Sequence, residues 1–252
     1  MFGAAITIGI AFALSFLPSG WHDNTVLGIL TQRGYIPYIT LLGFNWGVVL
    51  IWLKSRKISA QRKGLNYIER YQPEEYISPS VSSIYMEWLN KHVSRPRDFL
   101  AVNRLYSALA SLNALRDPSA IPGVVASHTE TDEVQSDESF AFSSMLLFLI
   151  PILGFIGTVI GLSQSIGGFG TALSQNTEDL SLLIQSLQGV TGGLAVAFDT
   201  TLFALLCALV LQIYTSVVRS RESRFLEDIT AYFQHKFLPQ LRKDDSNTEK
   251  ED

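Results

Sequence analysis

The chain has 252 residues, of which 47% are hydrophobic and 17% charged, and its formal net charge is −4. The mild negative charge argues against nucleic-acid binding, which depends on clustered lysine and arginine. The single cysteine, Cys207, excludes a disulfide framework within one chain, and the mean hydropathy of +0.22 agrees with a membrane protein.

The first apolar segment covers residues 3–17, which is short for the roughly 20 residues that a membrane-spanning helix needs. A cleaved signal peptide is the alternative interpretation. However, no lysine or arginine precedes the segment, and residues 15–20 (SFLPSG) lack the small-x-small pattern of a cleavage site. We therefore expect this segment to be retained as a first span.

Three further apolar segments are long enough to cross a bilayer. The second span covers residues 35–53 and carries two tyrosines and a tryptophan near its ends, as aromatic belts at membrane interfaces predict. The third runs over about residues 140–166 and the fourth over about residues 189–218. The sequence therefore predicts four transmembrane helices.

Lysine and arginine are concentrated on one side of these spans. Five of them lie in residues 54–63 and three in residues 219–224, whereas residues 167–188 contain none. Cytoplasmic loops are enriched in these residues. We therefore expect both termini and residues 54–139 to be cytoplasmic, with the two short loops outside.

The cytoplasmic insertion has a helical pattern and no catalytic motif. Residues 83–93 and 99–116 carry apolar side chains at helical spacing, and prolines punctuate the segment. No phosphate-binding glycine loop, nucleophile elbow or zinc-ligand spacing occurs. The sequence therefore predicts a protein that is not an enzyme, with no cofactor and no bound metal.

Residues 127–138 (SHTETDEVQSDE) contain four side chains of metal-ligand type, His128, Glu130, Asp132 and Glu133. A solvated acidic segment that leads into the third span is the favoured interpretation. After the fourth span, apolar residues recur at helical spacing, which predicts an amphipathic extension. These residues are Phe225, Ile229, Tyr232, Phe233 and Phe237.

One face of the third span is lined by small or helix-kinking residues. They are Pro151, Gly154, Thr158, Gly161 and Ser165, at alternating spacings of three and four, with Gly157 close by. Lipid gives helices no hydrophobic reason to associate, so small residues that admit close backbone approach mark the faces that pack. This face is predicted to pack tightly.

The fourth span repeats the pattern with Gly193, Ala197, Thr201, Ala204 and Ala208, and Asp199 and Thr200 lie beside that face. Asp199 lies about ten residues inside the span, roughly 15 Å deep at 1.5 Å per residue. An ionisable residue at this depth usually faces protein or water. For Asp199, an interhelical contact and direct ion handling both remain open, and the threonines could either line an ion path or bond to backbone carbonyls.

Residues 151–162 (PILGFIGTVIGL) and 193–206 (GLAVAFDTTLFALL) resemble the paired signatures of the MotA/TolQ/ExbB family, the ion-conducting subunits of bacterial membrane motors. The resemblance covers roughly residues 145–215. Two spans before the cytoplasmic domain are similar to the flagellar-stator arrangement, whereas the TolQ and ExbB branch typically has one.

This resemblance implies a pentamer around two copies of a single-span partner that carries an intramembrane, ion-binding aspartate. Thr158 and Thr201 match the two signature threonines, and Pro151 matches the proline at the start of the third span in flagellar stators. Val196 stands where ExbB and TolQ have a glutamate, and Val210 where they have a proline. These departures argue against a transport-energising role like that of ExbB.

Together these observations predict an all-α integral protein of the bacterial inner membrane that acts as an ion-channel subunit of a two-component motor. A non-conducting membrane scaffold is the alternative. The conducted ion could be a proton or sodium, and the driven process stays open. The expected parts are a two-span hairpin (1–53), a cytoplasmic helical domain (54–139), a pore-forming hairpin (140–218), a cytoplasmic helix extension (219–242) and a disordered tail (243–252).

Overall fold

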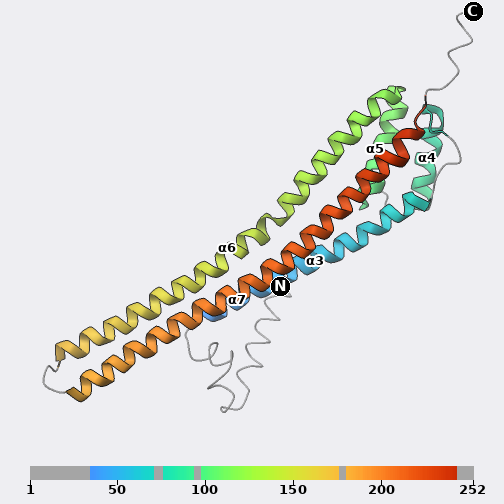
Figure 1. Ribbon diagram of the computed structural model, residues 1–252. Helices are drawn as coiled ribbons and strands as arrows, with labels where there is room; N and C mark the ends of the chain where they lie inside the picture. Colours follow the sequence, from blue (N-terminus) through green and yellow to red (C-terminus); the bar gives the residue numbers. More distant parts are fainter. Residues whose placement is uncertain (1–34, 71–75, 94–97, 176–179, 243–252) are drawn as a thin grey trace, which may run out of the picture. The chain divides into compact units, whose positions relative to one another are not determined.

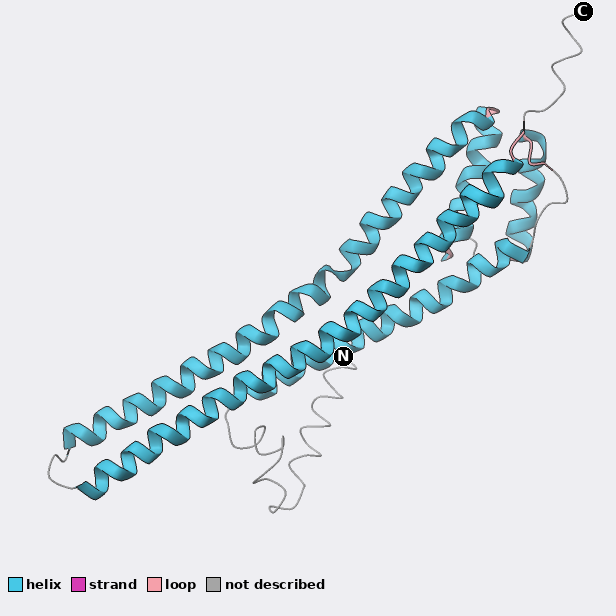
Figure 2. Cartoon of the chain, viewed as in Figure 1, coloured by secondary structure: helices cyan, strands magenta, loops and turns pink. Residues whose placement is uncertain are grey.

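The computed structural model describes residues 35–70, 76–93, 98–175 and 180–242. Helices account for nearly all of these residues, and within them the only β-type pairing is an isolated bridge between Ile77 and Leu241 (Figure 2). The predicted all-α class is therefore confirmed for the described part of the chain. The expected first span at residues 3–17 and the tail at 243–252 lie outside it.

Three long helices dominate the fold: α3 (Ile36–Arg70), α6 (Ile121–Gln175) and α7 (Leu180–Tyr232) (Figure 1). Each is long and apolar enough to cross a membrane. A helix of 55 residues such as α6 measures about 80 Å, whereas a bilayer's hydrocarbon core is about 30 Å thick. Each long helix therefore carries the chain well beyond one membrane crossing.

The connection between the last two helices is shorter than the loop expected over residues 167–188. α6 continues to Gln175 and α7 already begins at Leu180. Glycines at 167, 168 and 170 disfavour a helix, but no proline interrupts this stretch, and the Thr171 hydroxyl donates to the Gly168 carbonyl at 2.8 Å. The apolar pattern therefore marks the segments that can lie in the membrane, whereas the helices continue beyond those segments.

The chain divides into two compact units, and α3, α6 and α7 contribute residues to both. The apolar unit contains the described residues up to Trp52 together with Ala141–Val217. The polar unit contains Leu53–Phe140 and the described residues from Val218 onward. Each unit is held together by a different kind of contact.

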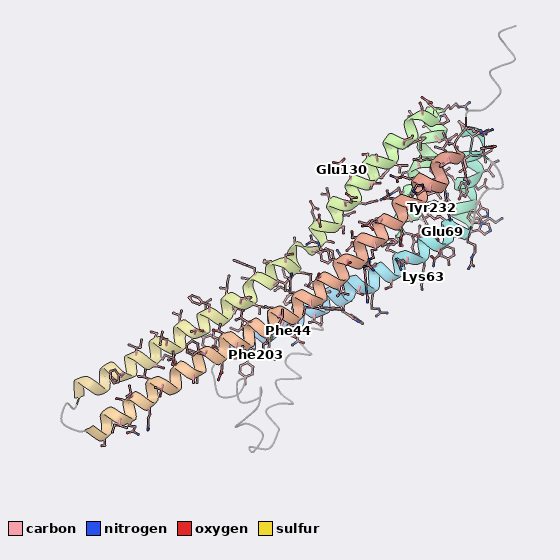
Figure 3. The ribbon with its side chains drawn as sticks, in the orientation of Figure 1. Phe44, Lys63, Glu69, Glu130, Phe203 and Tyr232 are labelled. Carbon is pink, nitrogen blue, oxygen red and sulfur yellow. The ribbon has the colours of Figure 1, made fainter. Side chains whose placement is uncertain are left out.

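In the apolar unit, a buried cluster lies where the three helices meet. Its members are Ile150, Phe203, Ala204, Cys207 and Leu211, and α3 packs against it through Leu41, Phe44 and Val48. Figure 3 labels Phe44 and Phe203. Many large apolar side chains point outward instead, for example Phe148 at 70% exposure. Such an exposed apolar surface is what lipid or a neighbouring subunit would cover.

The polar unit adds two shorter helices, α4 (Pro79–His92) and α5 (Leu100–Leu115), which confirm the helices predicted over residues 83–93 and 99–116. The short turn η3 (Pro118–Ala120) leads into α6, and the Asp117 side chain caps it by accepting from the Ser119 amide at 3.1 Å.

The predicted amphipathic extension is confirmed as a helix. α7 ends at Tyr232 and is followed by the π-helical turn η4 (Phe233–Phe237) and the turn η5 (Leu238–Gln240). All five apolar residues at helical spacing in this extension are buried. They form part of the core of the polar unit.

Arg104 of α5 is the largest fully buried side chain in the described residues, at 2% exposure. Its Nη2 atom lies 2.5 Å from Asp132 Oδ2 of α6, and its Nη1 atom donates to the hydroxyls of Thr129 at 3.1 Å and Thr230 at 3.4 Å. The expectation that residues 127–138 are a solvated acidic segment is therefore wrong for Asp132. This position of α6 faces α5, where a buried guanidinium needs a carboxylate.

Removing the buried guanidinium is expected to cost far more stability than breaking a surface ion pair. Arg104→Ala leaves the largely buried Asp132 carboxylate unpaired, which costs up to about 3–5 kcal/mol. Arg62→Ala is the matched control, because the Arg62–Asp228 pair at 2.9 Å is about half exposed and is worth at most about 1 kcal/mol. Loss of helical circular dichroism on heating in detergent measures both variants, and equal losses in melting temperature would contradict the assignment.

Candidate ion-path site at the α6–α7 contact

Gly154 of α6 brings the backbones of α6 and α7 into close contact. A Cβ atom built on Gly154 would lie 2.5 Å from the Cβ of Ala204 and 3.2 Å from the Cα of Thr201. Real Cβ atoms are essentially never closer than 3.0 Å to another heavy atom. Only glycine therefore fits at this position without moving the helices apart.

The contact continues along both helices through the other residues predicted to pack there. A Cβ built on Gly161 would lie 3.3 Å from the Cβ of Ala197, and one built on Gly193 would collide with the Ser165 side chain. Pro151 lies within α6, one turn before Gly154. The structure thus brings the predicted small-residue faces of the two helices together.

Helix α3 also takes part in this contact, which was not predicted from the sequence. A Cβ on Gly157 would lie 3.1 Å from Ile36 of α3 and 3.1 Å from the Thr200 hydroxyl. A Cβ built on Gly47 of α3 would lie 2.6 Å from the Leu211 side chain of α7. One built on Gly43 would lie 3.8 Å from the Ile150 side chain of α6. The spacing of four between Gly43 and Gly47 was the available signal, because it is a small-xxx-small pattern.

Thr158 of α6 and Thr201 of α7 meet directly at this contact, hydroxyl to hydroxyl. The Thr158 hydroxyl also lies 3.2 Å from the Gly154 carbonyl oxygen and 3.1 Å from that of Ala197. The Thr201 hydroxyl lies 3.1 Å from the Gly154 oxygen and 3.4 Å from the Ala197 oxygen. Two hydroxyls and two carbonyls therefore form one cluster of four oxygens, called the threonine pair site below.

The threonine pair site has more acceptors than protons. Each hydroxyl supplies one proton, while both hydroxyls and both carbonyls can accept. The two protons therefore have alternative partners: a carbonyl of the same helix, a carbonyl of the other helix, or the opposite hydroxyl. The oxygens of such a cluster could hydrogen-bond to a proton carrier or coordinate a small cation.

Asp199 and Thr200 directly precede Thr201 on α7. The buried Thr200 hydroxyl donates to the Ala197 carbonyl at 2.8 Å, so it bonds to its own helix. Asp199 precedes Thr201 by two residues, which at 3.6 residues per turn places it on roughly the opposite side of α7. Asp199 is partly buried, and the structure does not bring it to the paired threonines.

Long apolar helices and a polar cluster enclosed between them define an α-helical, multi-pass membrane protein. A model of the MotA/TolQ/ExbB proton channel family matches residues 100–231, which is just over half of the chain. The chain belongs to this family, and the predicted resemblance is confirmed. No curated protein and no solved structure matches the chain.

Family membership gives the chain a general role. The family consists of membrane proton channel subunits and is not known for enzymes, and it implies an inner-membrane protein that works in an oligomeric complex with a single-span partner. The matched residues include α5, α6 and nearly all of α7, and therefore both the threonine pair site and Arg104.

A single methyl group at Gly154 is expected to loosen the α6–α7 contact. Gly154→Ala places a Cβ against Ala204, and overpacking of this kind costs about 1–3 kcal/mol. Gly167→Ala is the matched control in the same helix, because a Cβ there meets nothing within 4 Å and alanine favours a helix over glycine. Melting temperatures in detergent separate the two, and a Gly154→Ala variant as stable as Gly167→Ala would contradict the close contact.

Proposed function

We propose that this chain is the ion-conducting subunit of a two-component inner-membrane motor that converts ion motive force into mechanical work. The observation that carries the proposal is the threonine pair site, a polar cluster enclosed between two apolar helices of a proton channel family member. The partner is a single-span protein with an intramembrane aspartate. By resemblance to the family, five copies of this chain surround two copies of the partner.

In this proposal the threonine pair site receives the ion as it leaves the carboxylate of the partner. An unpaired charge near the bilayer centre costs about 2.5–3.5 kcal/mol on insertion scales, and 100 mV of membrane potential supplies about 2.3 kcal/mol per charge. Because the two energies are similar, a few well-placed oxygens decide whether an ion passes. The hydroxyls of Thr158 and Thr201 and the carbonyls of Gly154 and Ala197 provide them.

The threonine pair site fits a proton or a sodium ion, since hydroxyls both donate and accept and carbonyls coordinate cations. The proposed topology has both termini and residues 54–139 in the cytoplasm, following the placement of lysine and arginine. Residues 140–218 form the conducting hairpin in this arrangement. The remaining parts follow the boundaries expected from the sequence.

A non-conducting scaffold is the second candidate, and one observation favours it. Each threonine hydroxyl lies within hydrogen-bond distance of a carbonyl of its own helix and of the other helix, so both could serve packing alone. In lipid, such interhelical bonds stabilise association by about 1 kcal/mol. The two candidates differ in whether ion flux depends on the hydroxyls.

Valine substitution at the threonine pair site is expected to stop conduction while leaving the fold intact. Valine keeps the shape of threonine but has no hydroxyl, and loss of a hydrogen bond to a charged group costs about 1.5–3 kcal/mol, roughly tenfold to a hundredfold in rate. Thr215→Val is the matched control, because Thr215 is buried in α7 and, among the described residues, its hydroxyl bonds only to the Leu211 carbonyl, at 2.8 Å.

Ion flux into vesicles that contain this chain and a single-span partner encoded beside it measures the effect. Thr158→Val and Thr201→Val should lose flux, and Thr215→Val should keep it. In the same assay Asp199→Asn is expected to assemble with strongly reduced flux if Asp199 handles ions. Wild-type flux in both threonine variants would favour the scaffold, and wild-type flux in Asp199→Asn would assign that residue to structure.

A further inference from the structure

An acidic face lies exposed on the part of α6 that belongs to the polar unit. Ala126, Glu130, Glu133 and Asp137 recur at spacings of four, three and four, and all four are exposed. This spacing places them on one side of the helix, as in the seam of a coiled coil. Asp137 forms an exposed ion pair with Arg219 at 2.7 Å, whereas Glu130 has no ion-pair partner among the described residues.

A basic face with the same spacing lies exposed on α3. Arg56, Ala60, Lys63 and Tyr67 recur at spacings of four, three and four, and all four are exposed, Tyr67 at 52%. None of the ion pairs within the described part of the chain involves Lys63. The unit thus presents a helix face of each sign.

The two faces lie on different sides of the polar unit and cannot meet within one copy. Figure 3 labels Glu130 on α6 and Lys63 on α3 at opposite edges of the unit, with α7 between them in that view. A contact between two different surfaces of identical subunits is heterologous, and repeated by rotation it generates a ring when the rotation closes. The arrangement therefore fits a second copy of this chain.

The charges also lie at matching heights along the unit. Lys54 of α3 bonds to the Ser139 hydroxyl of α6, so these two residues mark one level. Lys63 lies nine residues beyond Lys54, and Glu130 lies nine residues before Ser139, which is about 13 Å from that level in both cases. A rotation about an axis parallel to the helices keeps height unchanged, so Lys63 of one copy and Glu130 of the next are at the same height.

Counting residues from the level of Lys54 and Ser139 in the same way gives each position of the α3 face a counterpart at the same height on the α6 face. Lys63 falls opposite Glu130, Ala60 opposite Glu133, Tyr67 opposite Ala126 and Arg56 opposite Asp137. Both basic residues therefore meet acidic ones and the large tyrosine meets the small alanine, while Glu133 faces Ala60. A shift of one turn along either helix would remove the pairing of Lys63 with Glu130.

We propose that the α3 face of one copy, Arg56–Ala60–Lys63–Tyr67, docks on the α6 face of the neighbouring copy, Ala126–Glu130–Glu133–Asp137, and sets the register of the subunit ring. The proposal rests on the proposed function only in requiring a homo-oligomer. Because the pairs are solvent-exposed, this seam fixes orientation and register, and its strength falls as salt concentration rises.

Cysteine crosslinking in membranes of cells that express the full chain with its neighbouring genes tests the contact. In a Cys207→Ala background, Lys63→Cys combined with Glu130→Cys should give a ladder of covalent multimers on oxidation. Either single-cysteine variant should give none. Glu69→Cys combined with Glu130→Cys is the matched control, because Glu69 is exposed on α3 but lines a cavity with Asp228 and Tyr232, away from the basic face.

Charge exchange tests the register in a second way. Glu130→Lys should reduce the oligomer seen by native mass spectrometry, and adding Lys63→Glu should restore it. A monomer-only pattern from the Lys63–Glu130 cysteine pair, in a chain whose wild type is oligomeric, would overturn the seam and leave the ion path untouched. Crosslinking of the Glu69 control to the same extent would overturn it as well.

Discussion

The close approach of α6 and α7 at Gly154 is the constraint on which the rest of the site depends. Because Gly154 has no Cβ, the Thr201 hydroxyl lies 3.1 Å from the Gly154 carbonyl oxygen and also contacts the Thr158 hydroxyl. Any larger residue would separate the helices and pull the four oxygens apart. The packing of small residues therefore also brings the oxygens of the polar cluster together.

The two units are stabilised by different chemistry. In the apolar unit, glycine and alanine let backbones meet and large apolar side chains point outward, as expected where lipid removes the hydrophobic drive for helix association. In the polar unit, large apolar residues such as Phe233 are buried and a single arginine links three helices. Removal of apolar area from water stabilises that unit. Its largely buried ion pairs Arg104–Asp132 and Lys54–Glu222 are destabilising to break.

Much of this arrangement could be predicted from the sequence because it depends on local periodicity. The spacing of Gly154, Thr158 and Gly161 defines one face of a helix. The corresponding face of α7 can be predicted from residue spacing in the same way, without knowledge of the fold. The Arg104–Asp132 pair could not be predicted, since it joins residues 28 positions apart on separate helices. The spacing of Gly43 and Gly47 marks α3 as a packing helix, but it does not identify the partner of Gly47, since Leu211 is distant in sequence. The helix ends at Gln175 and Leu180 lie beyond the apolar segments that predict the spans.

The central claim is that ion flux needs the hydroxyls of the threonine pair site and not merely side chains of threonine's size. A double variant, Thr158→Ser with Thr201→Ser, keeps both hydroxyls and removes only two methyl groups. Ion flux in vesicles that hold this variant and the single-span partner is the most direct measurement. The account predicts flux close to wild type in the double serine variant and loss of flux in the corresponding double valine variant. Equal flux in the two variants would contradict it.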